Sequence, residues 1–105
     1  MKDESMFTDE GNALRVRLRG EIDHHTAKPV REAIDERVFL GRPHMLILDF
    51  SGVPFMDSSG LALILGRAEV MEQIGGALRL VGLSTRLRHL VHLCGVEKLP
   101  HLTIG

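Results

Sequence analysis

The chain has 105 residues and a formal net charge of −1, from 13 basic and 14 acidic residues. This length fits one domain spanning residues 1–105, and 44% hydrophobic with 26% charged residues is typical of a folded globular protein. No basic block, targeting signal or apolar span of about 18 residues occurs, so neither nucleic acid nor a membrane is an expected partner. A lone Cys94 cannot form an internal disulfide, which agrees with a reducing compartment and an expected cytoplasmic location.

Two strands are expected first, a short one near residues 5–8 and a longer one after a turn at residues 10–12. From residue 14 to residue 19, apolar side chains alternate with arginines, which is the period of a strand buried on one face. The other face either meets solvent or binds an anion, and it carries Arg15, Arg17 and Arg19.

A first helix follows, with apolar residues three or four apart at Ala27, Val30, Ile34 and Val38. Proline lacks an N–H and is best tolerated in a first turn, so Pro29 makes Thr26 a better N-cap than Asp23. The Gly-Arg-Pro sequence at residues 41–43 ends this helix. The next strand, residues 44–50, is almost entirely apolar, which predicts a central strand covered on both faces.

A short loop then brings Asp57 and two serines to the start of an apolar helix at residues 61–74. Asp57 occupies the N-cap position, and the unpaired N–H groups of a helix start leave the Ser58 hydroxyl exposed and compatible with an added phosphate. Gly60 stands where a capping box would have Glu or Gln. Because glycine there costs roughly 0.5–1 kcal/mol relative to alanine, it predicts a close approach by another backbone or by a partner.

This second helix carries two stripes of apolar and small residues. One is the expected core stripe, Leu61, Ile64, Ala68 and Met71. The other is covered either by a neighbouring helix or by another protein, and it comprises Ser59, Ala62, Leu63, Gly66 and Val70.

A Gly-Gly turn at residues 75–76 leads into a strand at residues 77–81. Ser84 caps a third helix that ends at Gly95, with a buried stripe of Leu87, Leu90, Val91 and Cys94. A last short strand is expected at residues 101–104. The alternation of strands and helices predicts an α/β fold with a small, mixed, mainly parallel sheet and an antiparallel edge.

The serine motif has two other interpretations. As a cap alone, Asp57-Ser58 needs no function. As a nucleophile, Ser58 only half matches the Gly-x-Ser-x-Gly elbow, because Met56 replaces the first glycine and spacing ties no histidine and acid to it. We therefore expect no enzyme activity, and no phosphate-binding glycine loop indicates a cofactor.

A metal site is not expected either. His89 and His92 share one helix face near Cys94, but no third or fourth ligand accompanies them.

Two segments resemble a known family. They are Gly20-Glu21-Ile22-Asp23-His24-His25-Thr26-Ala27 and Phe55-Met56-Asp57-Ser58-Ser59-Gly60-Leu61, continued by residues 64–67 and 73–76. Together they resemble the STAS-domain anti-sigma factor antagonists, in particular those acting at sporulation stage II in endospore-forming bacteria. The similarity covers most of the chain and implies the STAS fold, a small mixed sheet with packed helices.

The resemblance also implies a function. Such proteins bind an anti-sigma factor that is also a serine kinase, and thereby free the sigma factor. The kinase phosphorylates the serine matching Ser58, which ends the binding, and a dedicated serine phosphatase restores it. Ser59 is not the main acceptor. The rival interpretation is a scaffold or transport-linked STAS module that never meets a sigma factor.

Partner contacts are expected at Gly20, Glu21, Asp23, His24, Met56, Asp57, Ser58, Ser59, Gly60 and Leu63. Two departures from the family pattern stand out. Pro29 stiffens the first helix near its start, and the sequence ends at Gly105, where family members usually continue into another helix.

Overall fold

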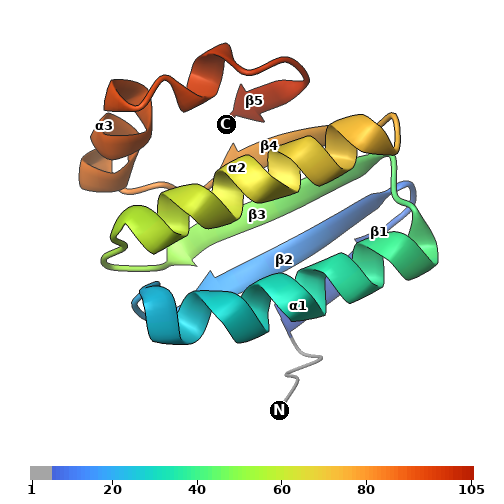
Figure 1. Ribbon diagram of the computed structural model, residues 1–105, viewed down its shortest axis with the longest axis horizontal. Coiled ribbons are helices and arrows are strands. Elements are labelled where there is room, and N and C mark those ends of the chain that lie inside the picture. Colours follow the sequence, from blue (N-terminus) through green and yellow to red (C-terminus); the bar gives the residue numbers. More distant parts are fainter. Residues whose placement is uncertain (1–5) are drawn as a thin grey trace.

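The computed structural model describes residues 6–105, which form one sheet with helices packed against it (Figure 1). Among these residues, no helix is long and apolar enough to cross a membrane. The elements in chain order are β1 (Phe7–Glu10), β2 (Ala13–Arg19), α1 (His24–Gly41), β3 (Met45–Gly52), α2 (Ser58–Gln73), β4 (Ala77–Val81), α3 (Thr85–Leu93), a 3-10 turn η2 (Val96–Lys98) and β5 (Leu102–Ile104).

The strands lie in the order β1-β2-β3-β4-β5. Only β1 and β2 are antiparallel, and the other three pairs are parallel. The predicted mainly parallel sheet with an antiparallel edge is therefore confirmed. Ser5, the first residue of the expected N-terminal strand, lies outside the described residues, and β1 begins two residues later.

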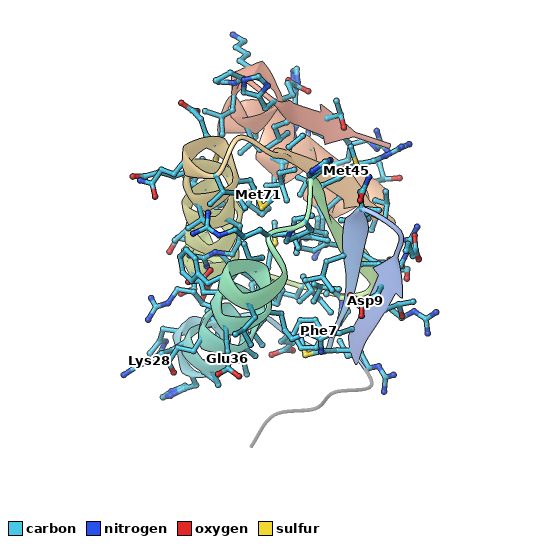
Figure 2. The ribbon with its side chains drawn as sticks, turned by 90° about the vertical axis from the view of Figure 1, so that its right-hand side faces the viewer. Phe7, Asp9, Lys28, Glu36, Met45 and Met71 are labelled. Carbon is cyan, nitrogen blue, oxygen red and sulfur yellow. The ribbon has the colours of Figure 1, made fainter. Side chains whose placement is uncertain are left out.

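The core lies between one face of the sheet and the helices. Every second strand residue points into it, as the alternation in β2 predicts. Phe7 and Met71 lie between the sheet and the helices in Figure 2, whereas Lys28 and Glu36 project away from the sheet. The largest fully buried side chains are aliphatic apart from one phenylalanine and one methionine: Val16, Ile34, Val38, Leu46, Leu48, Phe50, Ile64, Met71, Leu78, Leu80, Leu87 and Val91.

The opposite face of the sheet is open, so the expected covering of β3 on both faces is wrong (Figure 2). Ile47 on this face is nonetheless buried. Its neighbours in the strand register are Arg15 and Arg79, whose long aliphatic stems flank it while their charges reach water. Arg15 is paired with Glu10 at 2.8 Å and with Asp49 at 3.6 Å, so the protein's own carboxylates partly neutralise this face.

The start of α1 also differs from the expectation. Asp23, not Thr26, is the N-cap, and its carboxylate accepts hydrogen bonds from the N–H groups of His25 and Thr26. Thr26 completes a reciprocal capping box by accepting a 2.9 Å hydrogen bond from the Asp23 N–H. Pro29 consequently lies inside the helix, and this double cap offsets the hydrogen bond that proline cannot donate.

At the end of α3, the expectation for one residue is wrong. The Ser84 cap and the Gly95 stop are confirmed, with Gly95 at φ +70. Leu87 and Val91 are buried as expected, but Cys94 is exposed. The helix ends at Leu93, so Cys94 lies beyond the helical periodicity that predicted its burial.

A buried ion pair joins α1 to α2 at their middle turns. Arg67 is only 5% exposed, and its Nε lies 2.8 Å from Asp35 Oδ1, without the alignment of a hydrogen bond. Among the described residues, Arg67 Nη1 has no hydrogen-bond partner. Burial raises the pKa of Asp35 and lowers the pKa of Arg67, although each charge favours the other. Desolvation therefore outweighs the attraction within this pair.

Removing one member of the pair should be costly. Asp35→Ala leaves the Arg67 charge buried without a partner. We expect the free energy of unfolding, measured with urea at neutral pH, to fall by about 3 kcal/mol, at the low end for buried pairs because Asp35 is partly exposed. Asp35→Leu combined with Arg67→Met removes both charges and should recover most of this loss. A double variant as unstable as Asp35→Ala would contradict the assignment.

Candidate partner-binding site

Two loops that are distant in sequence are joined at the carboxyl edge of the sheet. Beyond the end of β2, Gly20 N–H donates to Gly52 O at 2.9 Å and Ile22 N–H donates to Phe55 O at 3.1 Å. In return, Asp57 N–H donates to Ile22 O at 3.2 Å. Ile22 and Met56 thus form an isolated parallel bridge. The two segments that carry the family resemblance therefore lie side by side.

Both α1 and α2 begin at this edge, toward which the arrowheads of β2 and β3 point in Figure 1. The start of α2 is capped as predicted, because Asp57 accepts a 2.7 Å hydrogen bond from Ser59 N–H. The helix begins at Ser58, three residues before the expected 61. Ser58 is exposed at the first helical position, while Ser59 is half-buried. An added phosphate at Ser58 would therefore meet the positive end of the helix.

The first turn of α1 places a second carboxylate beside this serine loop. Hydrogen bonds from the N–H groups of Thr26 and His25 hold the pKa of Asp23 below its ordinary value. Asp23 is therefore ionised at neutral pH. The rings of His24 and His25 lie close together, with centroids 3.9 Å apart and planes tilted by 39°.

Gly60 is explained by Met56, which comes from the same loop. A Cβ at Gly60 would lie 2.6 Å from Met56 Sδ and 2.7 Å from Met56 Cβ, closer than real contacts allow. The expected approach by another backbone or by a partner is therefore wrong, because a buried side chain of the domain itself occupies this space. Met56 is 2% exposed, so it is packed between the loop and the first turn of α2.

The ten expected contact residues divide by accessibility. Met56, Gly60 and Leu63 are buried and underlie the surface instead of belonging to it. Leu63 is covered within the domain, where α1 packs against α2, whereas Ala62 of the same stripe remains exposed. The other seven are exposed or partly exposed around the joined loops: Gly20, Glu21, Asp23, His24, Asp57, Ser58 and Ser59.

Phe55 belongs to this surface but was not among the expected contacts. It is 45% exposed, directly before the serine motif, and its carbonyl accepts the hydrogen bond from Ile22. A large apolar residue in a loop was the available signal. The loop has no regular periodicity from which the exposure of a side chain can be inferred. Only the structure shows that Phe55 is exposed whereas the adjacent Met56 is buried.

The surroundings of Ser58 bear on the alternatives of a nucleophile and of a metal site. In the part of the chain that the structure describes, no hydrogen bond links Ser58 to a histidine or a carboxylate, and no group of three or more His, Cys, Asp or Glu side chains is placed to hold a metal. His92 instead contacts Glu97, and His89 and His92 line a hollow between α3 and β5.

A family model for the STAS domain matches residues 6–104. The chain therefore belongs to the STAS domain family, and the predicted STAS fold is confirmed. An anti-sigma F factor antagonist of Paenibacillus polymyxa is 37% identical over 86 residues, which cover 82% of this chain and 74% of the relative.

Solved structures agree with this assignment. The anti-sigma factor antagonist SpoIIAA in its unphosphorylated form has a TM-score of 0.80 at 30% identity, covering 94% of this chain and 85% of that one. The phosphorylated form of Bacillus SpoIIAA has a TM-score of 0.71 at 30% identity, covering 94% and 90%. The murine anion transporter Slc26a9 has a TM-score of 0.74 at 22% identity, covering 90% of this chain and 16% of the transporter, which concerns the fold alone.

The role of Gly60 can be tested against a second glycine of the same helix. Gly60→Ala should lower the free energy of unfolding by about 1–3 kcal/mol, because the new methyl group collides with Met56. A Cβ at Gly66 meets nothing within 4 Å, so Gly66→Ala should instead raise stability by about 0.5–1 kcal/mol. Urea denaturation of both variants measures the difference. Equal effects of the two substitutions would contradict the close packing of Met56 against Gly60.

The Asp23 cap predicts an acid dependence. Its folded pKa is lowered, so its contribution to stability is complete above the unfolded pKa and is lost as the pH falls through the folded value. Asp23→Asn keeps a capping oxygen but cannot titrate. We expect the stability advantage of the wild type over Asp23→Asn to be constant above about pH 5 and to shrink below about pH 4. Urea titrations at stepped pH test this, and an advantage undiminished at about pH 2 would contradict it.

Proposed function

We propose that this protein is an anti-sigma factor antagonist that binds an anti-sigma factor with serine kinase activity and so releases a sigma factor. Phosphorylation of Ser58 by that kinase ends the binding, and a serine phosphatase restores it. The observation that carries the proposal is the exposed Ser58 at the first position of α2, on the edge where the two loops are joined. The antagonist names of the relatives support it.

The partner surface in this proposal comprises the accessible loop residues. Glu21 and Asp23 supply negative charge, and Phe55 supplies an exposed aromatic anchor of the kind enriched at binding hot spots. The buried Met56, Gly60 and Leu63 position this surface from below. The protein needs no cofactor for this role and acts as a binding protein in the cytoplasm, without direct contact to nucleic acid or membrane.

A phosphate at Ser58 should leave the fold intact. It adds a charge of about −1.5 to −2. The helix macrodipole favours that charge, although Asp57 beside it opposes it. The Ser58 side chain is exposed, so the added atoms displace no core residue.

The same phosphate should end a contact made at this spot. Moving an equilibrium from 99:1 bound to 1:99 requires about 5.5 kcal/mol. A charge left without a partner in a tight interface costs several kcal/mol, and like charges brought together add to it. Local repulsion and desolvation therefore suffice for the switch, without a large conformational change.

The alternative function is that of a scaffold or transport-linked STAS module. The fold shared with an anion transporter is the observation that favours it. That role requires no modification of Ser58, so a phosphorylation assay separates the two.

The experiment uses each serine-kinase anti-sigma factor encoded in the source genome. Each is purified and incubated with the protein and ATP, and phosphate incorporation is located by mass spectrometry. We expect one phosphate on Ser58, none on Ser58→Ala, and wild-type incorporation on the matched control Ser59→Ala. Binding to the same kinase should be lost in Ser58→Asp, while its thermal unfolding midpoint stays near that of the wild type.

Each alternative result has a clear meaning. Phosphorylation of Ser58→Ala to the wild-type extent would overturn the site assignment. A collapse of stability in Ser58→Asp would favour a serine that serves only as part of the cap. The absence of binding to every such kinase would favour the scaffold role.

A further inference from the structure

A groove separates the first two turns of α1 and α2, directly beside Ser58. Its volume is about 200 Å³. Ser59, the immediate neighbour of Ser58, forms part of its wall. We call it the α1–α2 groove, and it is lined by His24, Ala27, Lys28 and Arg31 from α1 and by Ser59, Ala62 and Leu63 from α2.

The groove has small apolar walls and a cationic rim. Ala27, Ala62 and Leu63 supply the apolar part, and Lys28 with Arg31 supply the positive charge. Within residues 6–105, neither Lys28 nor Arg31 forms an ion pair at 4 Å or less. Figure 2 shows Lys28 projecting away from the sheet, so its ammonium group is free to meet a partner.

The positive charge continues down the seam between the two helices. One helical turn below Arg31 lies the Asp35–Arg67 pair, and the Arg31 charge acts on both members. The seam thus holds three cationic side chains and one carboxylate. Arg67 Nη1 is buried there without a hydrogen-bond partner among the described residues. The capping carboxylates Asp23 and Asp57 lie at the helix starts, but the groove lining itself contains Lys28 and Arg31 and no carboxylate, so it would attract an added anion.

We infer that the α1–α2 groove receives an aspartate or glutamate side chain of the anti-sigma partner. This inference rests on the proposed function and names the chemistry that the site recognises. The short aliphatic stem of such a side chain would contact the apolar walls, and its carboxylate would pair with the cations at the rim. A basic side chain would be repelled, and a second copy of this chain docked groove to groove would bring Lys28 and Arg31 against a like-charged rim.

The groove also explains how the switch gains its strength. Phosphate on Ser58 would sit next to the mouth of the groove, since Ser59 lines it. The dianion would repel the incoming carboxylate and compete with it for Lys28. The same cations therefore attract the partner's carboxylate before phosphorylation and attract the phosphate on Ser58 afterwards.

The test is a charge reversal on the rim. The probe is the anti-sigma kinase that phosphorylates the wild-type protein in the experiment above, and the dissociation constant is measured by calorimetry. Lys28→Glu should weaken binding about tenfold or more, and Lys28→Met, which keeps the stem but not the charge, should weaken it less. The matched control is Arg79→Glu, which changes net charge equally on the open face of the sheet and should bind within about twofold of wild type.

A compensating change in the partner completes the test. Acidic residues of the kinase are replaced singly by lysine, and one such variant should bind Lys28→Glu better than it binds the wild-type protein. If Lys28→Glu bound the kinase with wild-type affinity while Ser58→Asp abolished binding, the proposed role of the groove would be overturned. The proposed function would not be affected. Equal weakening by Lys28→Glu and Arg79→Glu would also overturn it, because net charge alone would then act. A wild-type protein that binds no such kinase would remove both proposals together.

Discussion

The bridge between Ile22 and Met56 is the constraint on which the site depends. Three backbone hydrogen bonds continue the pairing of β2 and β3 past the end of the sheet and join the two loops that precede α1 and α2. Because each loop ends in a capping aspartate, the bridge fixes both helix starts side by side. The proximity of the two capped helix starts and the α1–α2 groove between them follow from that junction.

Packing below the site holds the two helices in register. Met56 fills the space that a side chain at Gly60 would need, so the first turn of α2 can approach the bridge only because position 60 is glycine. Further down, the Asp35–Arg67 pair fixes which turn of α1 faces which turn of α2. Burial shifts the pKa of both members against ionisation, so desolvation offsets much of the attraction between them. The charge of Arg31, which lines the α1–α2 groove, acts on both members of the pair and so links the pair to the proposed recognition of an acidic side chain.

Local sequence signals identified most elements and the candidate serine. The alternation in β2, the Asp57 and Ser84 caps and the glycine stop at Gly95 each depend on a few neighbouring residues, and all are confirmed. The joining of the two motif segments was suggested only by family resemblance. Hydrogen bonds between residues about 35 positions apart have no local signature, so their geometry had to come from the structure.

By itself, the sequence determined the order and type of the elements, the antiparallel edge and the exposed serine at a helix start, because short-range periodicity and capping chemistry govern them. The tertiary structure decided the rest. It placed Asp23 as the cap with Pro29 inside α1, left one face of β3 uncovered, exposed Cys94 and formed the groove between the helices. Each of these depends on what packs against a residue from elsewhere in the chain, and a pattern of neighbours along the chain does not contain that information.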